Sequence, residues 1–207
     1  MSFGITRLFK ANDPQKLIDA NNDHLDKYNR KNAYIAKSIT RPNIFLLASR
    51  YEDLSEKEEQ EEENRSEGLV NKSGGGEFID IQLVKVLNNN NEGKGVALST
   101  NAYLSVFGGQ NNNVRKTTEL NKIISDLDGK SLLKKGISQF QTTGITGMPM
   151  NQVYVWHAID SYETANKVLQ DGIGVFHSDD SLRIIQEVLP LWQVKNRGFF
   201  KTVRNMG

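Results

Sequence analysis

The chain has 207 residues, enough for one large domain or two small ones with a substantial hydrophobic core. Its formal net charge is +1, its hydrophobic fraction is 37%, and its mean hydropathy is −0.53. Binding to duplex nucleic acid is not expected, because that function needs a dense cationic face. The absence of cysteine excludes disulfides, thiolate zinc sites and cysteine nucleophiles.

The N-terminal segment MSFGITRLFKANDP has no apolar stretch of the kind found in signal peptides. Apolar runs such as residues 44–48 are far shorter than the roughly 20 residues that span a bilayer. We therefore expect a soluble protein that is cytoplasmic in the producing cell and has no transmembrane segment. Translocation into a host cell without a signal peptide is left open.

The first expected element is a helix with Asp13 as its N-cap and Pro14 at its first position. Apolar residues recur on one narrow face as far as about Lys37. The pair Arg41-Pro42 then ends the helix, since proline disfavours helical backbone in the residue before it. Residues 43–50 follow as a short buried strand or a helical turn, and the strand is preferred.

Residues 52–67 are rich in glutamate and almost free of apolar side chains, which is typical of a solvated helix or of a disordered arm. A docking site for a basic partner is the alternative function of this acidic arm. Residues 71–76, NKSGGG, predict a flexible linker. They do not form a phosphate loop, because a strand pattern follows the glycines where that motif needs a helix.

Residues 78–87 alternate like a half-buried strand and then shift phase, which indicates a bulge. Residues 96–107 are expected to return as the partner strand of a long hairpin after an Asn/Gly-rich loop. An amphipathic helix over about 120–129 follows, with one further apolar turn. The Thr/Gly-rich segment 142–149 then marks the boundary between an N-terminal α+β region, 1–145, and a C-terminal module, 146–207.

The C-terminal module opens with a strand over 152–156. A helix over 160–171 begins at the capping-box pair Asp160 and Glu163, and a second helix over 179–189 ends at Pro190. The fold class predicted from these elements is α+β. It combines amphipathic helices, a small antiparallel β-hairpin or sheet, and a C-terminal strand–helix–helix module, which is possibly packed as one domain with the first region.

Candidate site residues are few. His157 and His177 flank a predicted helix, but two histidines without a third spaced ligand do not define a metal site, so no metal is predicted. Ser99 and Ser105 lack the glycine elbow of serine hydrolases. Surface association depends on a few large side chains, and the candidate interaction anchors are Tyr103, Phe107, Trp192 and Phe199.

Residues 154–157, YVWH, together with Asn166 and residues 168–173, VLQDGI, resemble the histidine-containing branch of ADP-ribosyltransferases. This resemblance implies that His157 hydrogen-bonds the nicotinamide ribose of NAD and is the catalytic candidate. The sequence departs from that pattern at Ala158, where the family has glycine. It also has no tyrosine after Tyr162, and Glu187 lies in a predicted helix.

The asparagine-rich, cysteine-free composition resembles that of effector proteins that intracellular bacteria inject into host cells. That resemblance implies an effector-like interaction module that binds a host or partner protein and needs no cofactor. The alternative is an NAD-dependent ADP-ribosyltransferase centred on His157. Whether the chain is an enzyme, and in what oligomeric state it works, are left open at this point.

Overall fold

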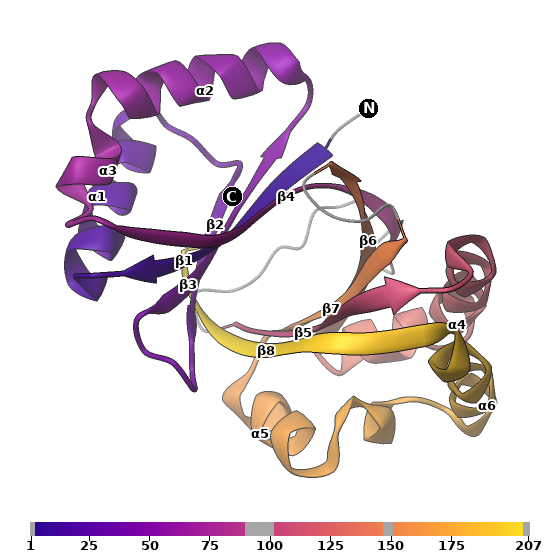
Figure 1. The fold of residues 1–207 in the computed structure, drawn as a ribbon. Helices are drawn as coiled ribbons and strands as arrows, with labels where there is room; N and C mark the ends of the chain where they lie inside the picture. Colours follow the sequence, from indigo (N-terminus) through magenta and orange to yellow (C-terminus); the bar gives the residue numbers. More distant parts are fainter. Residues whose placement is uncertain (1–2, 90–101, 147–150, 205–207) are drawn as a thin grey trace.

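The computed structural model describes residues 3–89, 102–146 and 151–204, and its eight strands close into an antiparallel barrel (Figure 1). The strands follow one another around the barrel in the order β1-β3-β2-β8-β5-β7-β6-β4. The elements in chain order are β1 (Phe3–Ala11), α1 (Pro14–Lys27), β2 (Ala33–Ser38), β3 (Ile44–Tyr51), α2 (Leu54–Ser66), α3 (Leu69–Lys72), β4 (Gly76–Asn89), β5 (Tyr103–Asn111), α4 (Val114–Lys134), β6 (Ile137–Thr146), β7 (Gln152–Ile159), α5 (Tyr162–Asp171), the 3₁₀ turn η1 (Ile173–Phe176), α6 (Asp179–Val188), η2 (Leu189–Leu191) and β8 (Trp192–Arg204).

The barrel consists of two halves with the same order of elements. Strands β1 to β4 form one sheet in the order β4-β1-β3-β2, and β5 to β8 form a second sheet in the matching order β8-β5-β7-β6. Each half is a βαββαβ unit, the arrangement known as ferredoxin-like. Two antiparallel ladders, β2 with β8 and β4 with β6, join the halves into a closed sheet.

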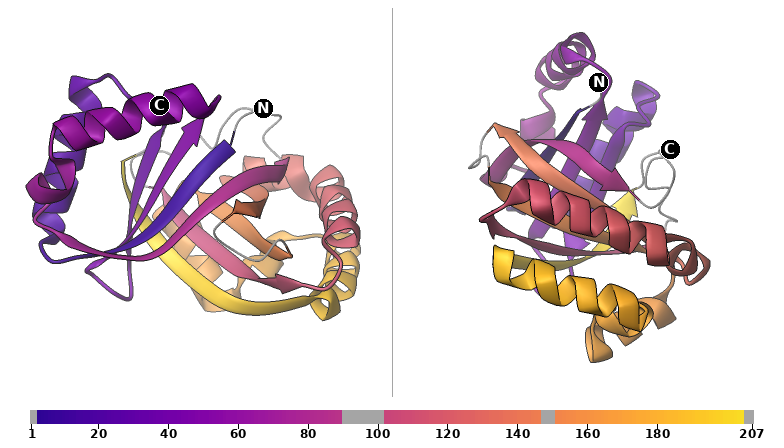
Figure 2. Two further views of the ribbon diagram at one scale, coloured as in Figure 1. Left: turned by 45° about the horizontal axis from the view of Figure 1, so that its top comes forward. Right: turned by 90° about the vertical axis from the view of Figure 1, so that its right-hand side faces the viewer.

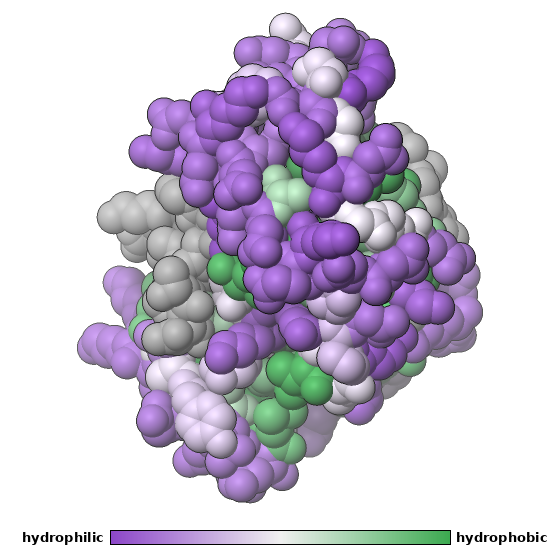
Figure 3. Space-filling model, turned by 90° about the vertical axis from the view of Figure 1, so that its left-hand side faces the viewer, coloured by the Kyte–Doolittle hydropathy of each residue, from purple (hydrophilic) through white to green (hydrophobic). Residues whose placement is uncertain are grey.

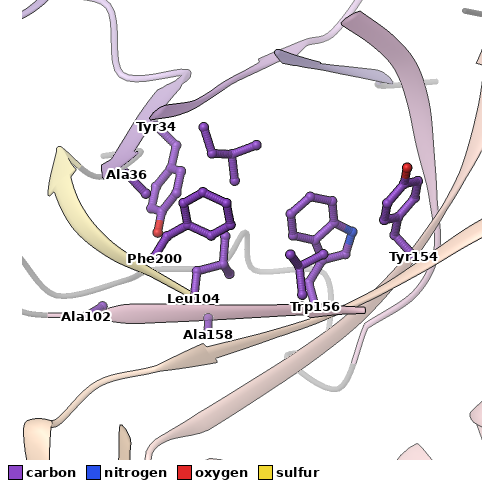
Figure 4. Close-up of a cluster of buried hydrophobic side chains, with 10 residues drawn as sticks. Tyr34, Ala36, Ala102, Leu104, Tyr154, Trp156, Ala158 and Phe200 are labelled. Atoms are coloured by element: carbon purple, nitrogen blue, oxygen red, sulfur yellow. The ribbon is translucent and has the colours of Figure 1, made fainter. Parts of the chain in front are cut away.

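The interior of the barrel is filled by side chains that point inward from every second residue of the strands. The cluster in Figure 4 combines aromatic and small residues from both halves, among them Tyr34, Trp156 and Phe200. The polar groups within it are paired: the Trp156 Nε1–H donates to the Thr142 hydroxyl at 2.8 Å, and the Tyr34 and Thr202 hydroxyls lie 2.8 Å apart. The interior of an eight-stranded barrel is just wide enough for side chains to fill, so this interior is a packed core and not a channel.

The helices cover the outer face of the barrel in two separate groups (Figure 2). Helix α1 covers the first half, where Leu17 and Leu25 pack on Phe9, Ile35 and Phe45 of the sheet. Helices α4, α5 and α6 cover the second half, and the buried residues there are Leu132, Ile137, Ile159, Ala165, Val168 and Phe176. Strands under these helices therefore have one face in the barrel core and one face under helices, whereas β4 has Ile81 and Val86 48% and 58% exposed.

The predicted fold class is wrong. The strands form a closed eight-stranded barrel and not a small hairpin beside a helical module. In the described residues, the two strands of the expected hairpin do not pair with each other, because β4 pairs with β1 and β6 whereas β5 pairs with β7 and β8. Long-range pairing of this kind leaves no local signal in the sequence. The predicted loop and strand residues 90–101 and the connector residues 147–150 lie outside the described part of the chain.

The first predicted helix is too long. Helix α1 ends at Lys27, where Asn29 has φ of 50° and the Arg30 N–H donates to the Leu25 carbonyl. A left-handed residue just beyond a helix and such a return bond are a known way of ending a helix. Residues 33–38 form strand β2 instead. Both C-terminal helices are confirmed, and Ser178 is the N-cap of α6. The predicted capping pair Asp160 and Glu163 is wrong, since the side chain of Ser161 caps α5 by accepting from the Thr164 N–H.

The acidic segment is helical, since it forms α2 with Asp53 as its N-cap. No helix in the described residues is long and apolar enough to cross a membrane.

The packed interior predicts that Trp156→Ala, which removes a side chain only 5% exposed, lowers the free energy of unfolding by about 3–5 kcal/mol. The matched control is Leu169→Ala, at a side chain 54% exposed on α5, which should cost less than about 1 kcal/mol. Urea unfolding at neutral pH measures both. Equal effects of the two substitutions would contradict a packed barrel interior.

Candidate functional site

A cavity of about 150 Å³ lies between the outer face of the first-half sheet and helices α1, α2 and α3. We call it the first-half cavity. Apolar side chains form most of its wall, including Phe9, Leu17 and Leu47. A few polar groups interrupt that wall, and they are Arg7, Asn21, His24, Ser49, Gln60, Asn64 and Ser73. An apolar pocket with a small number of convergent polar groups is the usual form of a ligand site.

The strand pairing explains how Arg7 and Ser49 reach this cavity. Arg7 of β1 lies between Leu47 of β3 and Ile81 of β4, at the centre of the first-half sheet. Successive side chains of a strand point to opposite faces, so Arg7 and Phe9 face the helices while Leu8 enters the barrel core. The same alternation brings Leu47, Ser49 and Tyr51 to the outer face.

Helix α2 lies over the cavity without an apolar contact surface of its own. Its only buried residue among those described is Gln60, and it is attached by polar bonds. The Arg30 guanidinium bonds both carboxylate oxygens of Glu63, the shorter contact being 2.7 Å, and both side chains are 16% exposed. Glu67, just beyond the helix, pairs with Lys27 and Lys72. Ion pairs therefore hold the cover of the cavity in place.

His24 is the buried titratable group of this site. It lies in the last turns of α1, is 5% exposed, and neither ring nitrogen has a hydrogen-bond partner among the described residues. Burial lowers the pKa of His24 below its ordinary value of 6.5, although the charges of Glu63 and Glu67 oppose this shift. At neutral pH the ring is therefore uncharged, and it has one donor and one acceptor unused.

His24 also lines a second hollow, of about 480 Å³, between α1 and the segment around α3. That hollow is polar, with Lys16, Asp23 and Lys72 among its lining residues. Figure 3 shows this face of the molecule, which is mainly hydrophilic with small separate hydrophobic areas. The imidazole therefore lies between an apolar interior space and the polar surface.

At the matching position of the second half, apolar side chains stand in place of Arg7 and His24. The ladders begin with the pairs Phe3–Tyr51 and Tyr103–Ile159, so Phe107 corresponds to Arg7 and His157 corresponds to Ser49. Counted from their N-caps, Ile124 of α4 corresponds to His24 of α1. Ile124 is 1% exposed, and the ring of Phe107 meets the ring of His157 edge-on at 6.0 Å. Side chains fill this place.

A buried polar cluster fixes α6 to α4 in that half. Asp128 of α4 accepts hydrogen bonds from the Nδ1 of His177 at 3.0 Å and from the Ser178 N–H at 2.9 Å. Burial by itself raises the pKa of Asp128, but the bonds from Ser178, Ser181 and His177 outweigh it and lower the pKa to about 2. The carboxylate is thus charged over the whole physiological range and serves as an anchor for the start of α6.

The predicted catalytic residue His157 lies on β7, facing α4. It is 4% exposed, and burial together with the neighbouring His177 lowers its pKa to about 3. His157 therefore stays neutral, and it does not line the first-half cavity. Among the described residues, no group of three or more histidine or carboxylate side chains is placed to hold a metal ion.

The four predicted interaction anchors lie in the second half and are partly buried. Tyr103 and Phe199 pack against the cluster under α5, with ring centroids 6.1 Å apart. The Arg197 guanidinium lies over the Phe107 ring at 5.6 Å. Trp192 donates its ring N–H to the Gly109 carbonyl at 3.2 Å. Sequence reasoning missed both Arg7 and His24, because a lone histidine in a polar helix gives no sign of burial.

The sequence matches no protein-family model and no curated protein. Solved structures share the fold. A protein of Fusobacterium nucleatum, described as a "Putative monooxygenase", has a TM-score of 0.71 at 9% identity over 98% of this chain and 93% of its own. An anthrone oxidase-like protein has a TM-score of 0.62 at 9% identity over 98% and 92%. A heme-binding protein of Thermus thermophilus has a TM-score of 0.57 at 9% identity over 98% and 92%.

These neighbours define the class as an α/β barrel of two ferredoxin-like halves, shared with monooxygenase-like and chlorite dismutase-like proteins. The expected resemblance to effectors and to ADP-ribosyltransferases is wrong, as is the expected function as an interaction module or NAD-dependent transferase. Residues 154–173 matched the transferase pattern only because a buried strand followed by a capped helix is a common local arrangement.

The expectation of no cofactor, with NAD as the alternative, is also overturned, since the fold neighbours make heme the group to test. The described residues do not fit a heme. His24 lines a cavity of about 150 Å³, whereas pockets for drug-sized ligands measure about 300–1,000 Å³. The hollow of about 480 Å³ that His24 also lines is walled mainly by charged side chains, among them Lys16, Asp23 and Lys72, which do not suit the apolar faces of a heme. Near His157 and His177 the space under α4 is taken by Ile124 and Leu132, which are 1% and 0% exposed.

The Asp128 anchor predicts a specific pH dependence of stability. Its pKa in the folded state is about 2 and its ordinary value is 3.8, so the unfolded chain binds the proton more tightly. The anchor's contribution, about 2 kcal/mol, is therefore present above about pH 4 and is lost as the pH falls towards 2. Urea unfolding of the wild type and Asp128→Asn between pH 3 and 7 measures it.

The difference in the free energy of unfolding between the wild type and Asp128→Asn should be largest at neutral pH and should become smaller below pH 4. A gap that stays constant across this range would show that Asp128 acts through packing and not through its charge. Asp126→Asn is the matched control, since Asp126 lies on the same helix and has no ion pair with a described residue.

Proposed function

We propose that the chain binds a small, largely apolar molecule, about the size of one aromatic ring, in the first-half cavity. The observation that carries this proposal is His24, a residue 5% exposed whose two ring nitrogens have no hydrogen-bond partner among the described residues and which lies beside an apolar space. An unpaired buried polar group costs free energy, so its presence calls for a function. A dry cavity of about 150 Å³ holds a molecule of the size of benzene.

The chemistry of the site suits removal of a proton from the bound molecule. A neutral imidazole inside an apolar wall acts as a hydrogen-bond partner in the ground state and as a general base in a reaction. Its lowered pKa keeps it unprotonated and ready to accept a proton at neutral pH. Oxidation of the bound molecule by O₂ is the reaction class that the neighbours described as monooxygenase and anthrone oxidase-like support.

The proposal does not include a bound macromolecule. Lack of binding to duplex nucleic acid stays a prediction based on the net charge of +1.

Thermal shift with phenol and with toluene tests the proposed site. Both probes fit the cavity, but only phenol can bond to His24, so phenol should stabilise the wild-type protein more. In His24→Leu the rise in melting temperature with phenol should fall to the rise seen with toluene, because the leucine side chain offers no hydrogen bond. The melting temperature without ligand should stay equal or rise, since the substitution removes an unpaired buried polar group.

His157→Leu is the matched control, because it makes the same change at a buried histidine of the other half. Its phenol shift should equal that of the wild type. A phenol shift that is lost in His157→Leu and kept in His24→Leu would move the site to the second half. No shift with either probe in the wild type would overturn the proposed function. Oxygen uptake with phenolic probes is the accompanying assay of reaction class.

A further inference from the structure

We propose that the natural ligand of the first-half cavity is an anion: a small aromatic carboxylic acid whose carboxylate binds Arg7. This inference rests on the proposed function and adds the chemical class of the ligand. Its starting point is the charge of the lining residues. Among the described residues that line the cavity there is one cation, Arg7, and no aspartate or glutamate.

Arg7 has no carboxylate partner within the part of the chain that the structure describes. None of the hydrogen bonds and ion pairs formed among the described residues involves its guanidinium. The side chain is partly buried and rises from the centre of the sheet, between Leu47 and Ile81. Arginine in such a place normally pairs with a carboxylate or phosphate, because its planar fork offers two parallel donors. A ligand carboxylate would complete that pair.

Helix α2, which covers the cavity, has no charged side chain at the positions that line it. Helix α2 carries six glutamates in 13 residues, yet the two α2 residues that line the cavity are Gln60 and Asn64. These positions lie one helical turn apart and so share one face. Amide side chains donate hydrogen bonds to an anion, whereas glutamates there would repel it.

Two carboxylates close in sequence to the lining residues Asn64 and Leu69 are already neutralised. Glu63 is held by Arg30, and Glu67 is held by Lys27 and Lys72. They therefore do not compete for Arg7. The apolar wall formed by Phe9, Leu17 and Leu47 then selects an acid with a flat apolar body over a hydrated inorganic anion.

The orientation of the acid follows from the two ends of the polar lining. Arg7 belongs to the sheet and His24 belongs to α1, on opposite walls of the cavity. A ring substituent on the far side from the carboxylate, such as a hydroxyl, would meet the unpaired imidazole. A hydroxybenzoate-type ligand therefore satisfies both unpartnered groups at once, which neither benzoate nor phenol does alone.

The test is titration calorimetry at pH 7 with benzoate and with benzamide, which has almost the same shape and no charge. The wild type should bind benzoate at least about tenfold more tightly than benzamide. Arg7→Gln should remove that preference and leave benzamide binding unchanged. Arg7→Lys, which keeps the charge but loses the fork, should retain part of the preference.

Arg115→Gln is the control, because Arg115 is a 91% exposed arginine on α4 of the other half. It should leave both affinities unchanged. Raising the salt concentration should weaken benzoate binding and not benzamide binding.

The outcomes separate the two proposals. Equal binding of benzamide and benzoate, or a benzoate preference that survives in Arg7→Gln, overturns the anionic ligand while the small-molecule site stands. Binding of neither compound, together with no response to phenol, overturns the proposed function and with it the inference.

Discussion

The pairing of edge strands is the constraint on which this structure depends. Each half alone would be a four-stranded sheet with two exposed edges, β2 and β4 in one half and β6 and β8 in the other. Unpaired strand edges invite aggregation. The β2–β8 and β4–β6 ladders remove all four edges at once and create the closed interior. Each half therefore completes the other.

Closure also decides where a ligand site can form. The barrel interior is taken up by the core around Trp156 and Phe200, so a binding space has to lie on the outer face, under helices. The two halves use that face differently. In the second half Ile124 and Phe107 occupy the matching positions under the helices, whereas in the first half Arg7 and His24 line a cavity. The two halves thus share one fold but differ in the side chains on this face.

Polar attachment of α2 explains how such a cavity persists in a small domain. A helix with an apolar face would pack onto the sheet and close the space, because burying apolar surface is favourable. Helix α2 has no such face and is held at its end by the Arg30–Glu63 and Lys27–Glu67 pairs. The acidic run that looked like a solvated arm therefore serves as a spacer over the site.

Local chemistry determined much of the secondary structure: the caps at Asp13 and Ser178, strand β3, helices α5 and α6, and the absence of cysteine chemistry. Only the tertiary structure decided the barrel and the site. Pairing of β1 with β4 or of β2 with β8 joins residues far apart in the chain, and no residue type marks such partners. His24 and Arg7 look like ordinary surface residues until the sheet and α2 enclose them, because burial is a property of the assembled fold and not of the segment.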